Sequence, residues 1–262
     1  MAKWGNLCFM VVDLQKANIW KRIAAWIFDG ILICVLAVGC GALLANLMDY
    51  DTKAAMLDAV YGRYEAQYGV EFDITAEAYN AMTAEEQANY DAAYAALISD
   101  ETALTAYNAV INQTLIIVTF GILAAILVLE FAVPLMMGNG RTIGKRIFSL
   151  GLIRTDSVRV NSMQLFARAL LGKFTIETMI PVYILMMIFF GNMGMIGTLV
   201  LMALAVTQVI LLIVTYNNSQ IHDLLAGTIV VDIASQTVFR DTEELTEYTK
   251  RIHAERAARQ KY

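Results

Sequence analysis

The sequence predicts an all-α membrane protein with four membrane-spanning helices, a helical extracytoplasmic insertion and a small cytoplasmic β-sheet. Composition is the first reason: hydrophobic residues make up 58% of the 262-residue chain and charged residues only 16%. A soluble domain averages about 25% charged residues. The apolar residues are also gathered into long blocks. Finally, basic and acidic segments alternate between these blocks, as the positive-inside rule requires of a multi-pass protein.

The first apolar block covers residues 23–48 and contains a single charged residue, Asp29. At about 1.5 Å per residue, a helix of this length exceeds the roughly 30 Å hydrocarbon core, so it can span a bilayer. The preceding residues, 1–22, are basic and are expected in the cytoplasm. Trp20 and Trp26 flank the entry of this span. They are expected either at the headgroup level or packed between helices.

Residues 49–108 form a long acidic connection with twelve acidic and two basic residues, so it is expected outside the membrane. It is rich in Ala and Tyr, which indicates helices. One helix is expected over 53–68, ending at Gly69, and another follows the capping-box pattern of Thr83 and Glu86. A third should continue into the second span. The acidic surface is either a cation funnel or docking site for a basic partner, or a solvated face of a helical hairpin.

The remaining apolar residues predict three more spans: 109–137, 177–191 and 194–216. Pro134 is expected to kink or end the second span. The last two spans come from a stretch of 39 residues without a charge, about twice the length of one crossing. The break between them is expected at residues 191–194, a cluster of Gly and Asn that favours turn conformations.

Residues 138–176, between the second and third spans, are rich in Lys and Arg and are expected in the cytoplasm. Within them, residues 150–160 predict two short strands about a turn. A helix beginning at Ser162 is expected to lie along the inner leaflet, with Arg168 and Lys173 at headgroup level.

The chain is expected to return to the cytoplasm after the fourth span, because the tail is basic at its end. Residues 217–235 contain a β-like run, 228–233, that can pair with the hairpin. In the charged tail, 236–262, acidic residues come early and basic residues late, which suits a helix dipole. This tail is interpreted either as a solvated helix or as a partner-binding helix.

Three short motifs follow one another along the chain: RIAAWIFD at 22–29, GRTIGKR at 140–146 and HDLLAGT at 222–228. Their order and their positions relative to the spans resemble the RDD family of bacterial membrane proteins, over residues 16–48 and 111–235. The Arg and the two Asp that name this family correspond to Arg22, Asp29 and Asp223.

The resemblance implies a multi-pass protein of the bacterial cytoplasmic membrane with both termini in the cytoplasm. Most members of the family have no assigned activity, and some have been proposed to exchange Na⁺ or K⁺ for H⁺. The acidic insertion and the charged tail lie outside the resemblance, so it implies nothing for them.

Two carboxylates lie in the interior of the expected spans, Asp29 in the first and Glu130 in the second. Counted from the inner ends, both are roughly 9–10 Å deep, so they are expected at the same level. An ionised carboxylate at membrane depth costs about 2.5–3.5 kcal/mol, which calls for partners. Arg22 lies two helical turns before Asp29, and Asp223 follows the fourth span. We therefore expect Arg22, Asp29, Asp223 and Glu130 to form one charge cluster.

Secondary candidates are His222, Gln208, Arg141 and Arg168. His222 either titrates near neutral pH or serves as a hydrogen-bond partner of its neighbours. Gln208 lies near the middle of the fourth span, where a polar side chain either bonds to another helix or lines a pathway.

Two functions remain open at this point. The first is a monovalent-cation/proton exchanger or small-solute transport component, in which Asp29 and Glu130 bind the ion and Arg22 and Asp223 form a gate. The second is a non-transporting scaffold or accessory subunit, in which the same charges hold the bundle together.

The expected partners are the lipid bilayer, a monovalent cation or proton, and a second copy or another membrane protein, since four spans make a thin wall for an aqueous route. No nucleic acid and no cofactor are expected. Two His and no clustered Cys argue against a metal site, and no catalytic constellation indicates an enzyme.

Overall fold

The computed structural model describes residues 14–189, 194–215 and 217–259. The chain divides into two units, one of Met1–Leu36 with Leu123–Tyr262 and the other of Ala37–Ile122. Among the described residues, four helical runs are long and apolar enough to cross a membrane: Ile19–Leu47, Glu101–Met137, Ser162–Phe189 and Gly194–Val214. A mostly helical fold with a small two-stranded sheet is therefore confirmed.

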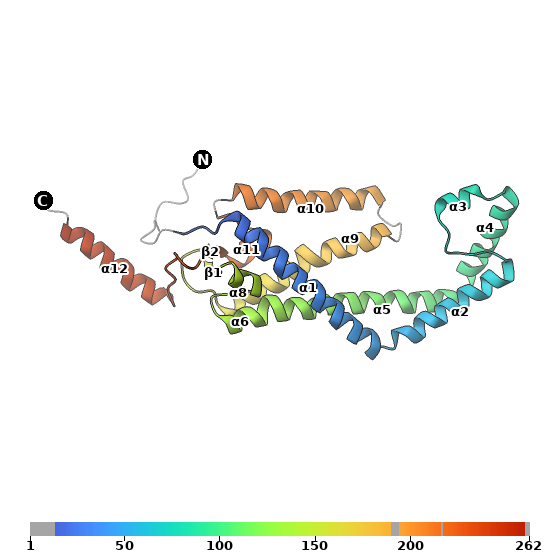
Figure 1. Cartoon of the computed structure of the whole chain (residues 1–262), viewed down its shortest axis with the longest axis horizontal. Helices are drawn as coiled ribbons and strands as arrows, with labels where there is room; N and C mark the ends of the chain where they lie inside the picture. The colour runs from blue at the N-terminus through green and yellow to red at the C-terminus, as the bar shows by residue number, and fades with distance from the viewer. Residues whose placement is uncertain (1–13, 190–193, 216, 260–262) are drawn as a thin grey trace. The chain divides into compact units, whose positions relative to one another are not determined.

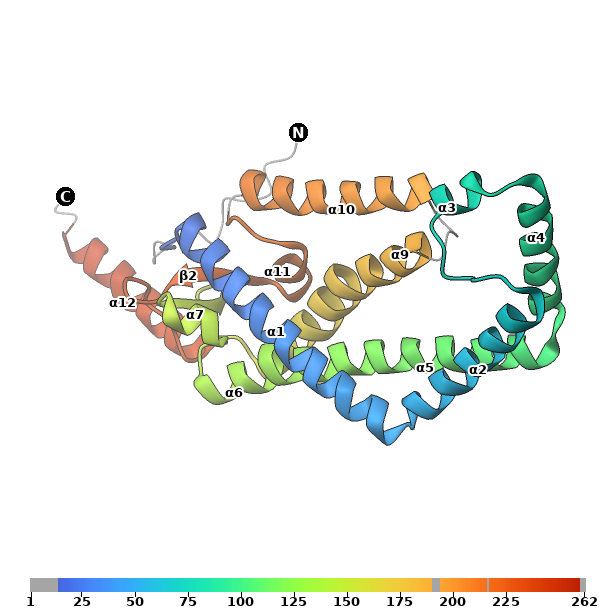
Figure 2. The same ribbon diagram turned by 45° about the vertical axis from the view of Figure 1, so that its right-hand side comes forward.

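The larger unit carries the sheet and most of the helices (Figure 1). Its elements are α1 (Ile19–Leu47, entering the smaller unit after Leu36), η1 (Leu127–Ala132), α6 (Val133–Met137), α7 (Ile143–Ile147), β1 (Leu150–Arg154), α8 (Ser162–Ala167), η2 (Arg168–Met179), α9 (Ile180–Phe189), α10 (Gly194–Val214), α11 (Ile221–Ala226), β2 (Thr228–Asp232) and α12 (Thr242–Arg259). The short elements α7, α11 and β2 gather beside the first turns of α1 (Figure 2). Most of the charged motif residues lie there.

The small sheet joins two segments that are distant in the sequence. β1 runs antiparallel to β2, with Leu150 opposite Asp232 and Arg154 opposite Thr228. The expected pairing of the run after the fourth span with residues 150–160 is therefore confirmed. The prediction of a second strand within residues 150–160 is wrong, because Arg159 forms only an isolated bridge to Ile153.

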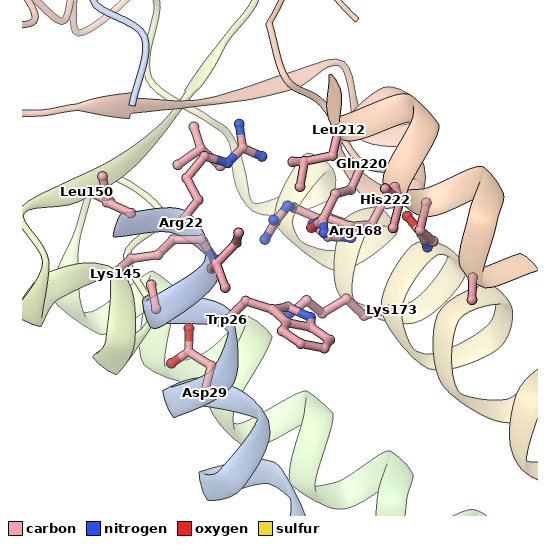
Figure 3. A pocket seen from close by; sticks show the side chains of 16 residues that line it. Arg22, Trp26, Asp29, Lys145, Leu150, Arg168, Lys173, Leu212, Gln220 and His222 are labelled. Atoms are coloured by element: carbon pink, nitrogen blue, oxygen red, sulfur yellow. The ribbon is translucent and has the colours of Figure 1, made fainter. Parts of the chain in front are cut away.

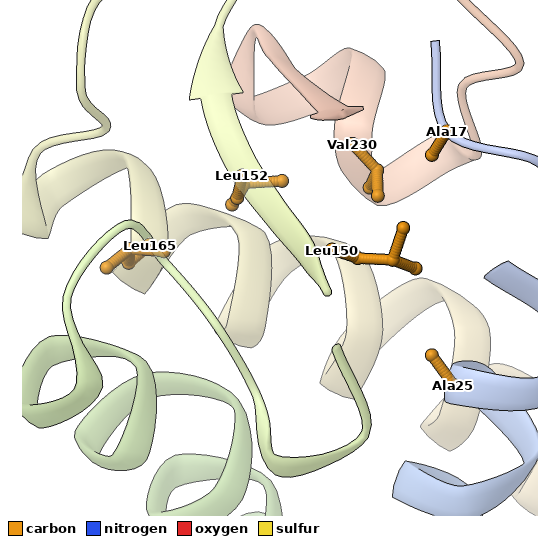
Figure 4. Close-up of a cluster of buried hydrophobic side chains, with 6 residues drawn as sticks. All are labelled: Ala17, Ala25, Leu150, Leu152, Leu165 and Val230. Atoms are coloured by element: carbon orange, nitrogen blue, oxygen red, sulfur yellow. The ribbon is translucent and has the colours of Figure 1, made fainter. Parts of the chain in front are cut away.

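Both faces of this sheet are covered by apolar side chains, because both strands are almost fully buried. On one face, Leu150, Leu152 and Val230 pack with residues of α1 and α8 (Figure 4). On the other, Ile153 packs with residues of β2 and their neighbours. Burial on both faces fixes the position of the strands beside α1, which is what places the motif residues that flank them.

The third candidate span differs from the expectation. A separate helix along the inner leaflet was expected from Ser162, followed by a span from residue 177. Instead, helical residues continue without a break from Ser162 to Phe189. The expected break at residues 191–193 lies outside the described residues, and α10 begins at Gly194.

The middle of this run, η2, is a π-helix in which backbone contacts span five residues rather than four. The hydroxyl of Thr178 follows the same spacing and donates to the carbonyl of Lys173 at 2.8 Å. A five-residue turn places Arg168 and Lys173 on one face, whereas an α-helix would rotate them well apart. This change of pitch arranges the charges described below.

Pro134 neither ends the second span nor interrupts its helical run, which continues to Met137. The π-helical segment η1 directly precedes it. Proline has no N–H, so the carbonyl of Glu130 lacks its usual α-helical donor, and a π turn is one way to absorb that loss. Glu130 itself lies within η1.

The smaller unit consists of the second part of α1, α2 (Tyr50–Tyr68), α3 (Ala76–Ala81), α4 (Ala84–Ser99) and most of α5 (Glu101–Ile126). The end of α2 at Gly69 and the capping box of Thr83 and Glu86 are confirmed. The continuous helix into the second span is confirmed as well. The short α3 was not expected, although the Thr75 side chain caps it in the ordinary way.

Helix α11 approaches η2 closely at Gly172. A Cβ atom added there would lie 2.4 Å from the Cβ of His222 and 2.6 Å from its Cα. Only a residue without a side chain allows this contact. The backbone of α11 is thus held against the π-helix that carries Arg168.

We expect Gly172→Ala to destabilise the protein by about 1–3 kcal/mol, because the new methyl group must displace the α11 backbone. The matched control is Gly30→Ala in α1, where an added Cβ meets nothing within 4 Å. Thermal unfolding of both variants in the same detergent measures the difference. Equal midpoints for the two variants would contradict the close packing of α11 on η2.

Candidate functional site

The carboxylate of Asp223 is the centre of a buried charge cluster. Asp223 has no exposed surface, and its position is set within α11, where its Oδ2 accepts a hydrogen bond from the backbone N–H of Gln220 at 3.3 Å. The Arg22 Nη2 atom lies 3.1 Å from Oδ2, and the Arg168 Nη2 atom lies 3.0 Å from Oδ1. Burial alone would raise the pKa of Asp223, but His222, Arg168 and Arg22 outweigh it and hold the pKa far below its ordinary value.

Arg168 links this centre to Glu130. Its Nη1 atom lies 3.6 Å from Glu130 Oε2, and Lys173 donates a hydrogen bond to Glu130 Oε1. Arg168 and Lys173 reach the same carboxylate because the π turn brings them to one face. Both side chains are buried within the protein and paired with acids. The expected association of Arg22, Asp223 and Glu130 is present, with Arg168 as the connecting residue.

Asp29 is held by a different set of donors. The hydroxyl of Thr142 donates to Asp29 Oδ2 at 2.5 Å, and the backbone N–H of Gly144 donates to Oδ1 at 2.7 Å. Gly144 permits this contact because a Cβ there would lie 2.5 Å from the carbonyl oxygen of Ala25. The motif at 140–146 therefore docks α7 onto α1 through the carboxylate.

The expected direct association of Asp29 with the other motif charges is not what the structure shows. Among the described residues, Asp29 forms no hydrogen bond or ion pair with Arg22 or with Glu130. Arg22 instead turns to Asp223 and to the carbonyl oxygen of Asn217. Asp29 and Glu130 thus have separate donors and do not share one site, and the buried Oε2 of Glu130 accepts no hydrogen bond from the described residues.

Of the secondary candidates, His222 is fully enclosed, and its Nδ1 lies 2.6 Å from Glu177 Oε1. Burial lowers the pKa of His222 below its ordinary value, despite the neighbouring acids. It acts as a hydrogen-bond partner of Glu177. Arg141 lies in the turn before α7 and does not line the cavity described next.

A cavity of about 430 Å³ adjoins the cluster. Four cationic side chains and one carboxylate line it: Arg22, Lys145, Arg168, Lys173 and Asp29. Lys145 and Lys173 extend toward one another from opposite sides, with Arg168 between them (Figure 3). Gln208, Gln220 and His222 add further polar groups, and the remaining lining residues are apolar. Cationic side chains therefore outnumber carboxylates in the lining by four to one.

Lys145 is the unusual member of this lining. It is only 7% exposed, and its ammonium group has one hydrogen-bond partner among the described residues, the hydroxyl of Thr142 at 3.5 Å. No described carboxylate forms an ion pair with it. Burial, and next the charge of Arg168, lower the pKa of Lys145 to about 8, although Glu130 and Asp29 oppose this shift. The other three cations each have a carboxylate partner.

Sequence reasoning missed the roles of Thr142, Lys145 and Glu177 and the pairing of Lys173 with Glu130. A signal existed for the first two, since both lie in the GRTIGKR motif. Glu177 directly precedes the charge-free stretch, so it was assigned only as the start of a span. No pattern at α-helical spacing connects Lys173 with Arg168.

Replacing Asp223 by Asn should destabilise the protein by about 3–5 kcal/mol, because two buried guanidinium groups lose their common counter-ion. The control is Asp232→Asn at the end of β2, which breaks the partly exposed pair with Lys21. Such a pair contributes about 0–1 kcal/mol. Thermal unfolding in detergent compares the two, and similar losses for both variants would show that Asp223 is not the anchor of the cluster.

Comparison with known proteins agrees with the motif geometry. No curated protein and no solved structure matches the chain. The model of the RDD family matches residues 16–227, which is most of the 262-residue sequence and includes Arg22, Asp29 and Asp223. The chain therefore belongs to the RDD family.

Proposed function

We propose that this RDD family membrane protein is a small-solute transport component that binds an anion in the cavity lined by Arg22, Lys145, Arg168 and Lys173. One observation carries the proposal. Lys145 is a buried ammonium group that lines this cavity and forms no ion pair with a described carboxylate, although Glu130 and Asp29 attract it from a longer distance. The cavity leaves room for a further counter-ion beside it.

Electrostatics favour an anion over a cation as the occupant. A charge taken out of water without a partner is costly, so a buried ammonium group either loses its proton or gains an anion. Each positive lining group attracts an anion and repels a cation. Two arginines and two lysines provide both directional and adaptable donors for oxygen atoms.

The exchange of a monovalent cation for a proton receives less support. Such an exchange needs a carboxylate that can give up its protein donors. Asp29 accepts two hydrogen bonds from α7, and Glu130 is paired with Lys173 and Arg168. A cation would also have to approach through four positive groups.

A scaffold without transport is the second candidate. It is favoured because both carboxylate oxygens of Asp223 are already paired with arginines. Arg22, Arg168 and Asp223 join α1, η2 and α11 without needing any ligand. Lys145 separates the two functions. A purely structural network does not need a buried ammonium group that lacks an ion pair. An anion-binding site needs such a group.

The proposal places the cavity at the cytoplasmic side, in line with the excess of Lys and Arg in residues 1–22 and 138–176. Both termini then face the cytoplasm, and the acidic residues 49–108 face outward. Association with a second copy or with another membrane protein would complete an aqueous route, which four spans by themselves enclose poorly.

Lys145→Met tests the site, with sulfate as the probe because it keeps its charge between pH 6 and pH 9. Low-millimolar sulfate, replacing chloride at constant ionic strength, should raise the unfolding temperature of the native protein. The Lys145→Met protein should lose this response and yet be at least as stable without sulfate, because a buried charge that forms no ion pair has been removed.

The exposed Lys53 supplies the control, since Lys53→Met removes the same charge in the other unit. That variant should keep the full sulfate response. A sulfate response that survives in Lys145→Met would reject the anion site. A loss of stability without sulfate in that variant would instead support the scaffold.

The sulfate response should also depend on pH. The pKa of Lys145 is about 8 in the unliganded protein, so the group is charged below pH 8 and neutral above it. Sulfate prefers the charged form, and its affinity should fall as the pH rises through about 8, approaching tenfold per pH unit. Titrations from pH 6.5 to 9.5 measure this, and a flat profile would exclude Lys145 as the binding group.

A further inference from the structure

We infer that the anion is the headgroup of an anionic phospholipid, which enters the cavity from the bilayer between α1 and α10 and leaves its acyl chains along Trp26 and Val209. This inference rests on the proposed anion site and goes beyond it by naming the class of ligand. It follows from the chemistry of the cavity mouth, from its depth and from the distribution of charge.

The wall of the cavity is divided into a polar and an apolar part. The cations come from α1, α7 and η2, whereas the apolar side includes Trp26 of α1 with Val209 and Leu212 of α10. Trp26 and Val209 are each 55% exposed although they line the cavity, so they form part of its rim. An apolar rim favours a ligand that itself has an apolar part.

Both helices that contribute this rim are candidate membrane spans, α1 and α10. Helix α10 packs on α9, and the side chains of Val206, Val209 and Ile210 remain about half exposed. In a bilayer such side chains contact acyl chains. Lipid thus has direct access to the rim, whereas a hydrophilic solute would have to cross apolar surface to enter there.

The depth of the cavity matches a headgroup. Arg22 is three residues and Trp26 seven residues after the start of α1, and Val209 is five residues before the end of α10. At 1.5 Å per residue, these side chains lie roughly 5–11 Å from the helix ends. Trp side chains favour this interfacial zone, and basic pockets between spans are known to bind lipid phosphates.

The charges also select an anionic over a zwitterionic lipid. A phosphodiester brings one negative charge to Lys145 and Arg168, and its oxygens accept charge-assisted hydrogen bonds. The choline group of phosphatidylcholine would bring a cation into a lining that already has four. Phosphatidylglycerol carries the phosphate without that cation.

Trp26 provides a direct test. The chain has three Trp residues, so a Trp4→Phe, Trp20→Phe background leaves Trp26 as the only one. This protein is reconstituted into phosphatidylcholine vesicles that contain a small fraction of lipid with brominated acyl chains, either phosphatidylglycerol or phosphatidylcholine. Bromine quenches Trp fluorescence on contact. We expect the apparent affinity of the quenching lipid to be about tenfold higher for phosphatidylglycerol, the effect of one charge-assisted contact.

Three substitutions in the same background complete the design. Lys145→Met should remove the preference for phosphatidylglycerol. Val209→Asn at the rim should weaken quenching by phosphatidylglycerol, whereas Val206→Asn, on the same helix, 49% exposed and outside the cavity, should not. Sulfate stabilisation in detergent, measured on the same proteins, reports the anion site without lipid.

The outcomes separate the two proposals. Equal quenching by the two brominated lipids, together with an intact sulfate response, would overturn the lipid inference and leave the anion site standing as a site for a soluble anion. Equal quenching without any sulfate response would overturn both. A preference for phosphatidylglycerol that survives Lys145→Met would show that this lipid contacts Trp26 without placing its headgroup beside Lys145. That result would also contradict the inference.

Discussion

The buried carboxylate of Asp223 between the guanidinium groups of Arg22 and Arg168 is the interaction on which the rest of the larger unit depends. It joins the start of α1, the π-helical η2 and the short α11, three elements that are far apart in the sequence. Two cations without the acid, or the acid without them, would be costly to bury, so the three elements are stable in this position only together. Because α11 leads directly into β2, the same contact also positions the sheet.

The surroundings of Asp223 show how backbone geometry supports the charges. Gly172 and Gly144 let α11 and α7 approach other helices more closely than any side chain would permit. The π turns of η1 and η2 then bring Glu130, Arg168 and Lys173 together. Charge pairing and close backbone contact therefore depend on one another, since ion pairs at about 3 Å form only when the backbone segments that carry the two groups are held at fixed positions.

Lys145 departs from this rule of complete pairing. Every other cation of the cavity forms an ion pair with an acid, whereas Lys145 has one hydroxyl contact at 3.5 Å and only longer-range attraction from Glu130 and Asp29. An unpaired buried charge lowers stability, and such a cost is typical of groups kept for binding rather than for folding. Its neighbour Gly144, by contrast, holds Asp29 and is structural. One short motif thus supplies, in consecutive residues, a docking contact to Asp29 and a cation that lines the cavity.

Much of this architecture was determined by the sequence alone. The apolar blocks, the capping box at Thr83 and the helix end at Gly69 follow from local composition and periodicity, because each depends on residues close together in the chain. The β character of the two paired runs is also local, although the pairing itself joins segments that are distant in the sequence. The association of Arg22 with Asp223 was predictable from the cost of burying a charge. Only the tertiary structure decided that Asp29 binds α7 instead of Arg22, that the helix from Ser162 runs on to Phe189, and that Arg168 and Lys173 share a face. Those outcomes depend on a π-helical pitch and on glycine contacts between distant segments, and neither leaves a periodic trace in the sequence.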